Sequence, residues 1–191
     1  MIRIGILGDI GAGKSYVANN FGYPVFNADH EVSKLYKKNR KIYNKLRKKL
    51  PKNISRFPID KKEITEAILS DKSNLRKIID IVHQEITKKL KLFLRKNKNK
   101  NKKIVILDIP LILENKINNK RDVLVFVDAK KKDIDIRLKK RINFNIKLYD
   151  KFKKIQLPIL YKKKRSHFVI KNNFKKKSVG KDIKNILKKI L

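Results

Sequence analysis

The eight residues Gly8–Ser15, which read GDIGAGKS, constrain this chain more than any other stretch. They fit G-x-x-x-x-G-K-[S/T], the pattern of a loop that binds phosphate groups. Its glycines let the backbone curl so that successive N–H groups point inward at phosphate oxygens. Lys14 can then reach the β- and γ-phosphates of a nucleotide, and the Ser15 hydroxyl can take one position on Mg²⁺. A helix that begins near Lys14 adds the positive end of its dipole.

The residues on both sides of this loop favour phosphate binding over a chance match. Ile2–Leu7 is an apolar run typical of a buried strand, and Tyr16–Phe21 is able to continue as a helix. Strand, glycine loop and helix form the context that the motif requires. The alternative is a glycine-rich turn in which Lys14 and Ser15 adjoin by accident.

Four further apolar runs predict the rest of a sheet, namely 23–27, 104–108, 123–128 and 168–170. Because helical segments alternate with these runs, we predict a five-stranded parallel sheet in a three-layer α/β/α fold. The chain of 191 residues is interpreted as one domain. The helical stretch from 31 to 100 is too long for a simple crossover and predicts a substrate-binding subdomain. Its first amphipathic segment, Glu31–Lys49, predicts one helix.

Two carboxylates that follow predicted strands are candidate reactive groups. Asp29 comes just past the second strand, and Asp108 ends the third. Parallel α/β sheets bind ligands at the carboxyl ends of their strands, so Asp29 is a candidate acid/base and Asp108 a candidate for the waters of Mg²⁺. The alternative for each is a helix or turn cap, and for Asp29 the spacing leaves both interpretations equal. Pro110–Glu114 then predicts a short helix.

A predicted helix over Asp133–Ile142 carries Arg137 and Arg141, which are four residues apart and so share one face. Such arginines clamp a phosphate when the helix closes over the site. The alternative is a basic surface face. The use of Arg in a chain that otherwise favours Lys is an argument for a functional role of these two residues. His83 lies beside an apolar stripe, where a lone histidine is more often a packed residue than a catalyst.

The charge of the chain is extreme, with 53 Lys and Arg against 17 Asp and Glu and a net charge of +36. Nucleic-acid binding is one interpretation. Lysines are spread along the chain without an aromatic-interleaved basic motif, so we favour a compositional bias of A/T-rich codons and expect no specific nucleic-acid partner. The chain has no cysteine, which excludes disulfides and thiolate zinc sites. No apolar run or leader pattern predicts membrane insertion or export, and we expect a cytoplasmic protein.

Almost the whole chain resembles the dephospho-CoA kinase family, with the motifs in the right order. The segments that carry the resemblance are Gly8–Ser15, Asn27-Ala28-Asp29, Ile59-Asp60-Lys61, His83, Leu107–Glu114, Arg137 with Arg141, Gln156-Leu157-Pro158 with Lys162, and Val169–Asn172. The Asp-x-Pro-Leu and Gln-x-Pro segments discriminate this family from other kinases with the same phosphate loop. The departures are Asp9, Tyr16, Asn27, Gln84, Ile134, His167 and Phe174.

The resemblance implies a P-loop kinase that transfers phosphate from ATP, with Mg²⁺, to the ribose 3′-hydroxyl of dephospho-CoA. It implies a core (1–30, 104–130, 166–191), an insert (about 31–103) and a lid (about 131–165). The implied catalytic residues are Lys14, Asp29, Arg137 and Arg141. The implied ATP-binding residues are Gly8, Gly11, Ala12, Gly13, Lys14, Ser15, Tyr16 and Asn172. The implied acceptor-binding residues are Asp29, His83, Asp108 and Pro110, and the implied Mg²⁺ residues are Ser15 and Asp108, through water.

Two other functions stay open at this point. One is a different P-loop kinase that acts on a nucleoside or nucleoside monophosphate, and the other is a basic nucleic-acid-binding protein. Asp9 also leaves a question, because it puts a negative charge in a loop built for anions. If its side chain points away from the phosphates the loop works normally, and if it points in, it weakens ATP binding.

Overall fold

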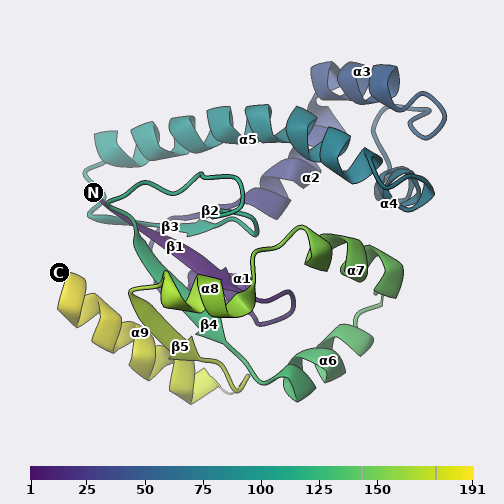
Figure 1. Ribbon diagram of the computed structural model, residues 1–191. Coiled ribbons are helices and arrows are strands. Elements are labelled where there is room, and N and C mark those ends of the chain that lie inside the picture. Colours follow the sequence, from purple (N-terminus) through teal and green to yellow (C-terminus); the bar gives the residue numbers. More distant parts are fainter. Residues whose placement is uncertain (143, 175) are drawn as a thin grey trace.

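Five parallel strands form the centre of the computed structural model, which describes residues 1–142, 144–174 and 176–191 (Figure 1). The strands are β1 (Ile2–Gly8), β2 (Val25–Asn27), β3 (Ile104–Asp108), β4 (Val123–Asp128) and β5 (Phe168–Lys171). Their spatial order is β2-β3-β1-β4-β5, and every neighbouring pair is parallel. The predicted five-stranded parallel α/β sheet is therefore confirmed.

Helices cover both faces of this sheet and extend beyond its edge (Figure 1). They are α1 (Lys14–Asn20), α2 (Ala28–Lys38), α3 (Arg40–Lys49), α4 (Lys61–Ser70), α5 (Asn74–Asn99), α6 (Lys131–Lys139), α7 (Ile146–Lys154), α8 (Ile159–Lys164) and α9 (Lys176–Ile190). Helices α1 and α9 pack together against strands on one face, and α5 packs with α2, α3 and α4 on the other. None of the described helices has the length and apolar character that a membrane span needs.

Alternate residues of the central strands feed two separate hydrophobic cores. Ile4 and Ile6 belong to the core with α1 and α9, whereas Leu7 and Leu107 belong to the core with α2–α5. This alternation follows from the pleat, which sends successive side chains to opposite faces of a strand. Because both faces are buried, the strands read as continuous apolar runs in the sequence.

Three predicted helices differ from those observed. The segment Glu31–Lys49 forms two helices, because the Asn39 backbone is extended and its side-chain oxygen accepts the N–H of Ile42 at 3.1 Å, which starts α3. Pro110–Glu114 forms turns instead of a helix. The helix predicted over Asp133–Ile142 is α6, which ends at Lys139.

Candidate active site

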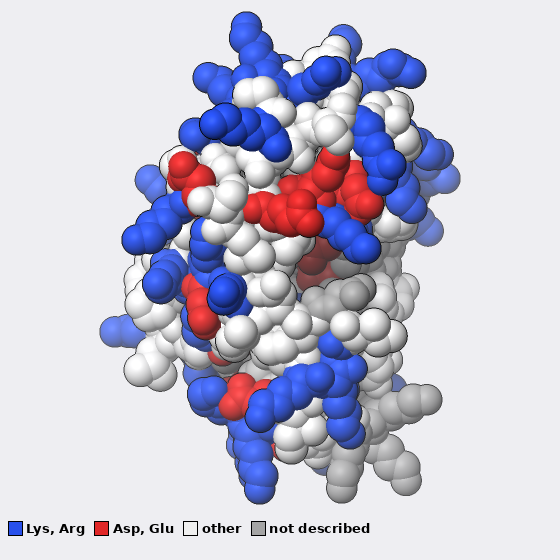
Figure 2. Space-filling model, turned by 90° about the vertical axis from the view of Figure 1, so that its right-hand side faces the viewer, with Lys and Arg blue, Asp and Glu red and all other residues white. Residues whose placement is uncertain are grey.

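The carboxyl ends of β1, β2 and β3 bring three predicted segments together. The phosphate-binding loop follows β1, and Asn27 and Asp108 are register partners at the ends of β2 and β3. Ligand sites of parallel α/β sheets form at this edge. Figure 2 views the molecule from this side and shows acidic side chains gathered near the middle, with lysines and arginines around them.

The loop Gly8–Ser15 has the backbone that its glycines allow. Gly11 and Gly13 adopt φ angles of 84° and 90°, which other residues rarely adopt. A methyl group on Gly13 would also overlap the side-chain amide of Asn172. Gly13 precedes the first turn of α1, so the loop leads directly into a helix N-terminus, where backbone N–H groups are free to bind an anion.

Lys14 folds back over its own loop. Its Nζ donates to the carbonyl oxygens of Asp9 at 2.8 Å and Gly8 at 3.3 Å. Burial and, second to it, the positive charge of Lys162 lower the Lys14 pKa to about 8, although Asp108 and other nearby carboxylates oppose the shift. A phosphate group would supply the anion that this desolvated ammonium group lacks.

Asn27 connects the ends of β2 and β3. Its side-chain nitrogen donates to Asp108 Oδ2 at 2.6 Å, and its oxygen accepts the N–H of His30 at 2.8 Å, so it is the N-cap of α2. Asn27 is one of the departures from the family motif, and its amide supplies a hydrogen-bond donor to Asp108 that an ionised carboxylate would lack. Asp108 is 3% exposed and its carboxylate is held in one orientation by this contact.

Asp29 lies in the first turn of α2 and is exposed to solvent, although neighbouring atoms partly desolvate its carboxyl group. Burial of its carboxyl group raises the Asp29 pKa, and the negative charge of Asp108 raises it further, while Lys14 and Lys61 oppose the shift. A carboxylate with a raised pKa accepts a proton more readily, as a general base must. The cap of α2 is Asn27, which leaves the Asp29 carboxylate available to a substrate.

The oxygen groups near the loop suit Mg²⁺ in type and number. Ser15 begins α1 beside Lys14, and Asp108 ends the neighbouring strand. Mg²⁺ prefers hard oxygen ligands and is usually held by one or two protein groups together with water and substrate phosphates. Within the described residues there is no cluster of three or more His, Cys, Asp or Glu side chains that could hold a metal ion.

The predicted arginines occupy different settings. Arg137 is on α6, and its guanidinium lies 4.3 Å from the ring centre of Phe174, a cation–π contact. Arg141 lies beyond the end of α6, so the two arginines do not share one helical face as predicted. Ile134 and Leu138, on the buried side of α6, lie close to Gly11, so this helix packs against the phosphate-binding loop.

The side-chain amide of Asn172 holds the phosphate-binding loop in place. Asn172 is 2% exposed, and its side-chain nitrogen donates to the Ala12 carbonyl at 2.8 Å. Its side-chain oxygen accepts the N–H of Phe174 at 2.9 Å, which joins the loop to the segment after β5. The same amide is the group that excludes a side chain at Gly13.

The remaining predicted site residues lie around this centre. Tyr16 is exposed in the first turn of α1, and Pro110 lies in the turn after β3. His83 is half-buried on α5, and among the described residues it makes no hydrogen bond to Asp29 or Asp108. The structure therefore groups the loop with Asp29 and Asp108, and His83 is not joined to them by any hydrogen bond between described residues.

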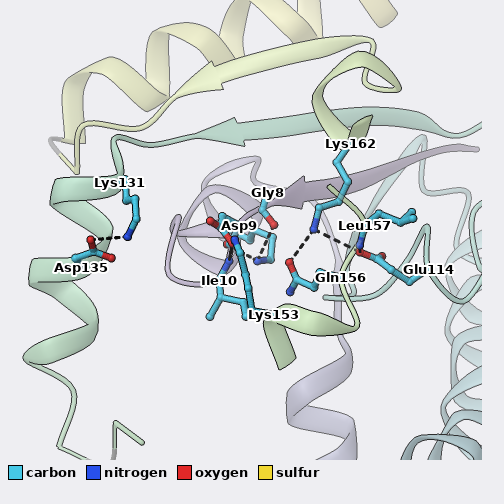
Figure 3. A network of polar contacts seen from close by, with 11 residues as sticks. Gly8, Asp9, Ile10, Glu114, Lys131, Asp135, Lys153, Gln156, Leu157 and Lys162 are labelled. Carbon is cyan, nitrogen blue, oxygen red and sulfur yellow. Dashed lines mark hydrogen bonds and ion pairs between the residues drawn. The ribbon is translucent and has the colours of Figure 1, made fainter. Parts of the chain in front are cut away.

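A buried network beside the loop was not predicted as part of the site. The Lys162 side chain is 1% exposed, and its Nζ donates to Gln156 Oε1 at 2.8 Å and pairs with Glu114 Oε1 at 3.4 Å. Glu114 Oε1 also accepts the N–H of Leu157 at 3.0 Å (Figure 3). Gln156 and Lys162 stood out in the sequence only through the family resemblance, because one lysine among so many carries no signal of burial.

A second unpredicted contact joins the loop to α7. Lys153 Nζ lies 2.6 Å from Asp9 Oδ1, so the carboxylate of Asp9 is paired in this structure (Figure 3). The same oxygen accepts the N–H of Ile10 at 2.7 Å. Nothing in the spacing of the sequence indicates this pair, because its members lie 144 residues apart.

Other proteins share this fold. A crystal structure of TT1252 from Thermus thermophilus has a TM-score of 0.77 at 24% identity, covering 100% of this chain and 98% of that one. Dephospho-CoA kinase from Campylobacter jejuni has a TM-score of 0.65 at 21% identity, covering 98% and 96%. Shikimate kinase from Bacteroides thetaiotaomicron has a TM-score of 0.56 at 11% identity, covering 99% and 98%. These likenesses confirm the P-loop kinase fold.

Sequence comparison identifies the family. The dephospho-CoA kinase from Wolbachia sp. subsp. Brugia malayi is 32% identical over 96% of this chain and 95% of its own length. The dephospho-CoA kinase from Wolbachia pipientis wMel is 33% identical over the same shares. The family model for dephospho-CoA kinase matches residues 2–178. A match over nearly the whole chain, together with these relatives, shows that the chain belongs to the dephospho-CoA kinase family.

Proposed function

We propose that this protein transfers the γ-phosphoryl group of ATP to the ribose 3′-hydroxyl of dephospho-CoA, the last step of coenzyme A synthesis. The observation that carries the proposal is the meeting of three groups at one edge of the sheet. Lys14 serves the phosphate donor, Asp29 serves the acceptor hydroxyl, and Asp108 interacts electrostatically with both. Family membership supports the choice of acceptor.

Asp29 is the proposed general base and orienting group. Its raised pKa, caused by burial and by Asp108, strengthens it as a proton acceptor. It would accept the proton of the ribose hydroxyl as the oxygen attacks the γ-phosphorus. The charge of Lys14 would stabilise the negative charge on the phosphoryl oxygens during transfer. Positioning and electrostatics of this kind supply most of the catalysis in phosphoryl transfer.

The residues proposed to hold Mg²⁺ are Ser15, through its hydroxyl, and Asp108, through water. When bound there, the ion would neutralise charge on the ATP phosphates. The hydrogen bond from Asn27 fixes the Asp108 carboxylate, and so determines which oxygen faces the site.

The helical segments on either side of the loop are proposed to exclude water. In this view α2–α5 forms an acceptor-binding insert and α6–α8 forms a lid. Arg137 and Arg141 would neutralise phosphate charge from the lid, with Tyr16 and Asn172 lining the ATP site, and His83 and Pro110 lining the acceptor site. Exclusion of water matters because an open site would hydrolyse ATP.

A coupled ADP-release assay with dephospho-CoA as acceptor tests the proposal. We expect ADP release that depends on the acceptor and on Mg²⁺. The Lys14→Ala variant should stay folded and lose most of this turnover. Release of ADP with a nucleoside or nucleoside monophosphate, and none with dephospho-CoA, would instead assign the protein to a different acceptor class.

A further inference from the structure

Asp9 is the residue at which two ammonium groups converge on the phosphate-binding loop. Its carboxylate Oδ1 accepts the N–H of Ile10 at 2.7 Å and pairs with Lys153 Nζ at 2.6 Å. Its backbone carbonyl accepts Lys14 Nζ at 2.8 Å. One ammonium group therefore comes from the loop itself. The other, that of Lys153, comes from α7 (Figure 3). A loop N–H and nearby ammonium groups are also what a bound phosphate oxygen receives in such a loop.

Helix α7 is held in place by contacts other than the one to Asp9. Leu148 and Phe152 pack against the hydrophobic core that contains α2–α5. Lys151 donates to the carbonyl of Ile68 near the end of α4, where a cation is favourable for the helix dipole. The position of α7 thus does not depend on Asp9 alone, and Lys153 extends from a supported helix toward the loop.

Lys153 lies where it can reach a ligand on the loop. Together with Asp9 it lines a cavity of about 310 Å³ between the loop, the end of β4, and helices α6 and α7. The Lys153 side chain is 36% exposed and that of Asp9 is 15% exposed. Two other lysines near this cavity have partners outside the loop, since Lys131 pairs with Asp135 and Lys163 with Asp128.

We propose that Lys153 is a phosphate ligand of the bound nucleotide and that Asp9 holds its ammonium group ready while the nucleotide is absent. The proposal rests on the proposed function only in assuming that ATP binds to this loop. A triphosphate carries more negative charge than one carboxylate and offers more acceptor oxygens, so the ammonium group would move from Asp9 to a phosphate oxygen. Asp9 would then repel the nucleotide while Lys153 attracts it.

The proposal predicts that substitutions of Lys153 and of Asp9 change the affinity for ATP in opposite directions, and this difference is the test. We would measure the Kd of ATP, and of adenosine as a phosphate-free probe, by calorimetry without an acceptor. The Lys153→Met variant should raise the Kd of ATP roughly 10- to 100-fold, the equivalent of one charge-assisted hydrogen bond, and leave the Kd of adenosine unchanged. Lys153→Arg should restore most of the affinity. Asp9→Asn should lower the Kd of ATP.

Lys154→Met is the matched control, because Lys154 is the exposed neighbour on the same helix, and it should bind ATP like the wild type. Thermal unfolding without ligand would show that each variant is folded. Equal losses of ATP affinity in Asp9→Asn and Lys153→Met would overturn the proposal and leave a purely structural pair. An unchanged Kd in Lys153→Met would overturn it too. If the wild-type protein binds ATP but does not phosphorylate dephospho-CoA, the proposed function is wrong, while the proposed role of Lys153 in ATP binding can still be tested. If it does not bind ATP, both fail.

Discussion

Replacement of Lys162 by methionine is expected to destabilise the protein strongly, although Lys162 lies outside the reacting groups. Its ammonium group is buried beside the phosphate-binding loop and neutralises Glu114, whose side chain is 8% exposed. Methionine keeps most of the apolar stem, so the loss arises from the charge. In Lys162→Met the Glu114 carboxylate would stay buried, with the N–H of Leu157 on Oε1 and no partner on Oε2 among the described residues.

The size of the effect follows from the burial of the pair. Removing one member of a buried ion pair leaves an uncompensated charge and costs about 3–5 kcal/mol. For a chain of this size a loss of 1 kcal/mol lowers the Tm by about 2–4 °C, so Lys162→Met should lower it by roughly 6–20 °C. The double variant with Glu114→Gln removes the unpaired charge and keeps an acceptor for Leu157. We expect it to lose only about 1–2 kcal/mol relative to wild type.

Urea unfolding followed by circular dichroism would measure both variants at low temperature, where the weaker one stays folded. Lys164→Met is the control, because Lys164 is exposed on the same helix and a surface substitution changes stability by at most about 0.5 kcal/mol. The reasoning would be refuted if Lys162→Met unfolded within about 1 kcal/mol of the wild type. It would also be refuted if the double variant were less stable than Lys162→Met alone.

Three further changes test the site. Asp29→Asn should lower turnover about 10²–10⁴-fold. Because Asp29 is exposed, the substitution should stabilise the fold only slightly above the raised pKa of Asp29, and this gain should vanish as pH falls toward the ordinary value of 3.8. Near-normal turnover would exclude Asp29 as the general base, and thermal melts that show a large gain at neutral pH would contradict its exposure. Gly13→Ala should abolish ATP binding, because φ is 90° there and the new methyl meets Asn172, so a wild-type Kd from calorimetry would contradict the loop geometry. Arg137→Ala should lower kcat/KM for ATP at least about 10-fold, and an unchanged value would limit Arg137 to its contact with Phe174.

Local patterns predicted the features that depend on neighbouring residues. The phosphate-binding loop is one contiguous segment whose glycine spacing specifies its backbone, so Gly8–Ser15 was identified without a structure. The strands were equally clear, because a parallel sheet buried on both faces needs unbroken apolar runs. Helix ends were harder to predict. The break at Asn39 comes from one side-chain hydrogen bond, which competes with the helical pattern over only a few residues.

The amino-acid sequence by itself determined the sheet, the loop and the family, whereas the tertiary structure decided which charged groups act on one another. With 53 Lys and Arg residues, neither residue type nor spacing distinguishes Lys153 and Lys162 from their exposed neighbours, and only the family resemblance singles out Lys162. Chain folding places one against Asp9, 144 residues away, and buries the other with Glu114. The register of β2 and β3 likewise sets Asn27 against Asp108. Pairing and desolvation are properties of the packed molecule, because burial determines whether a lysine is solvated surface charge or part of a site.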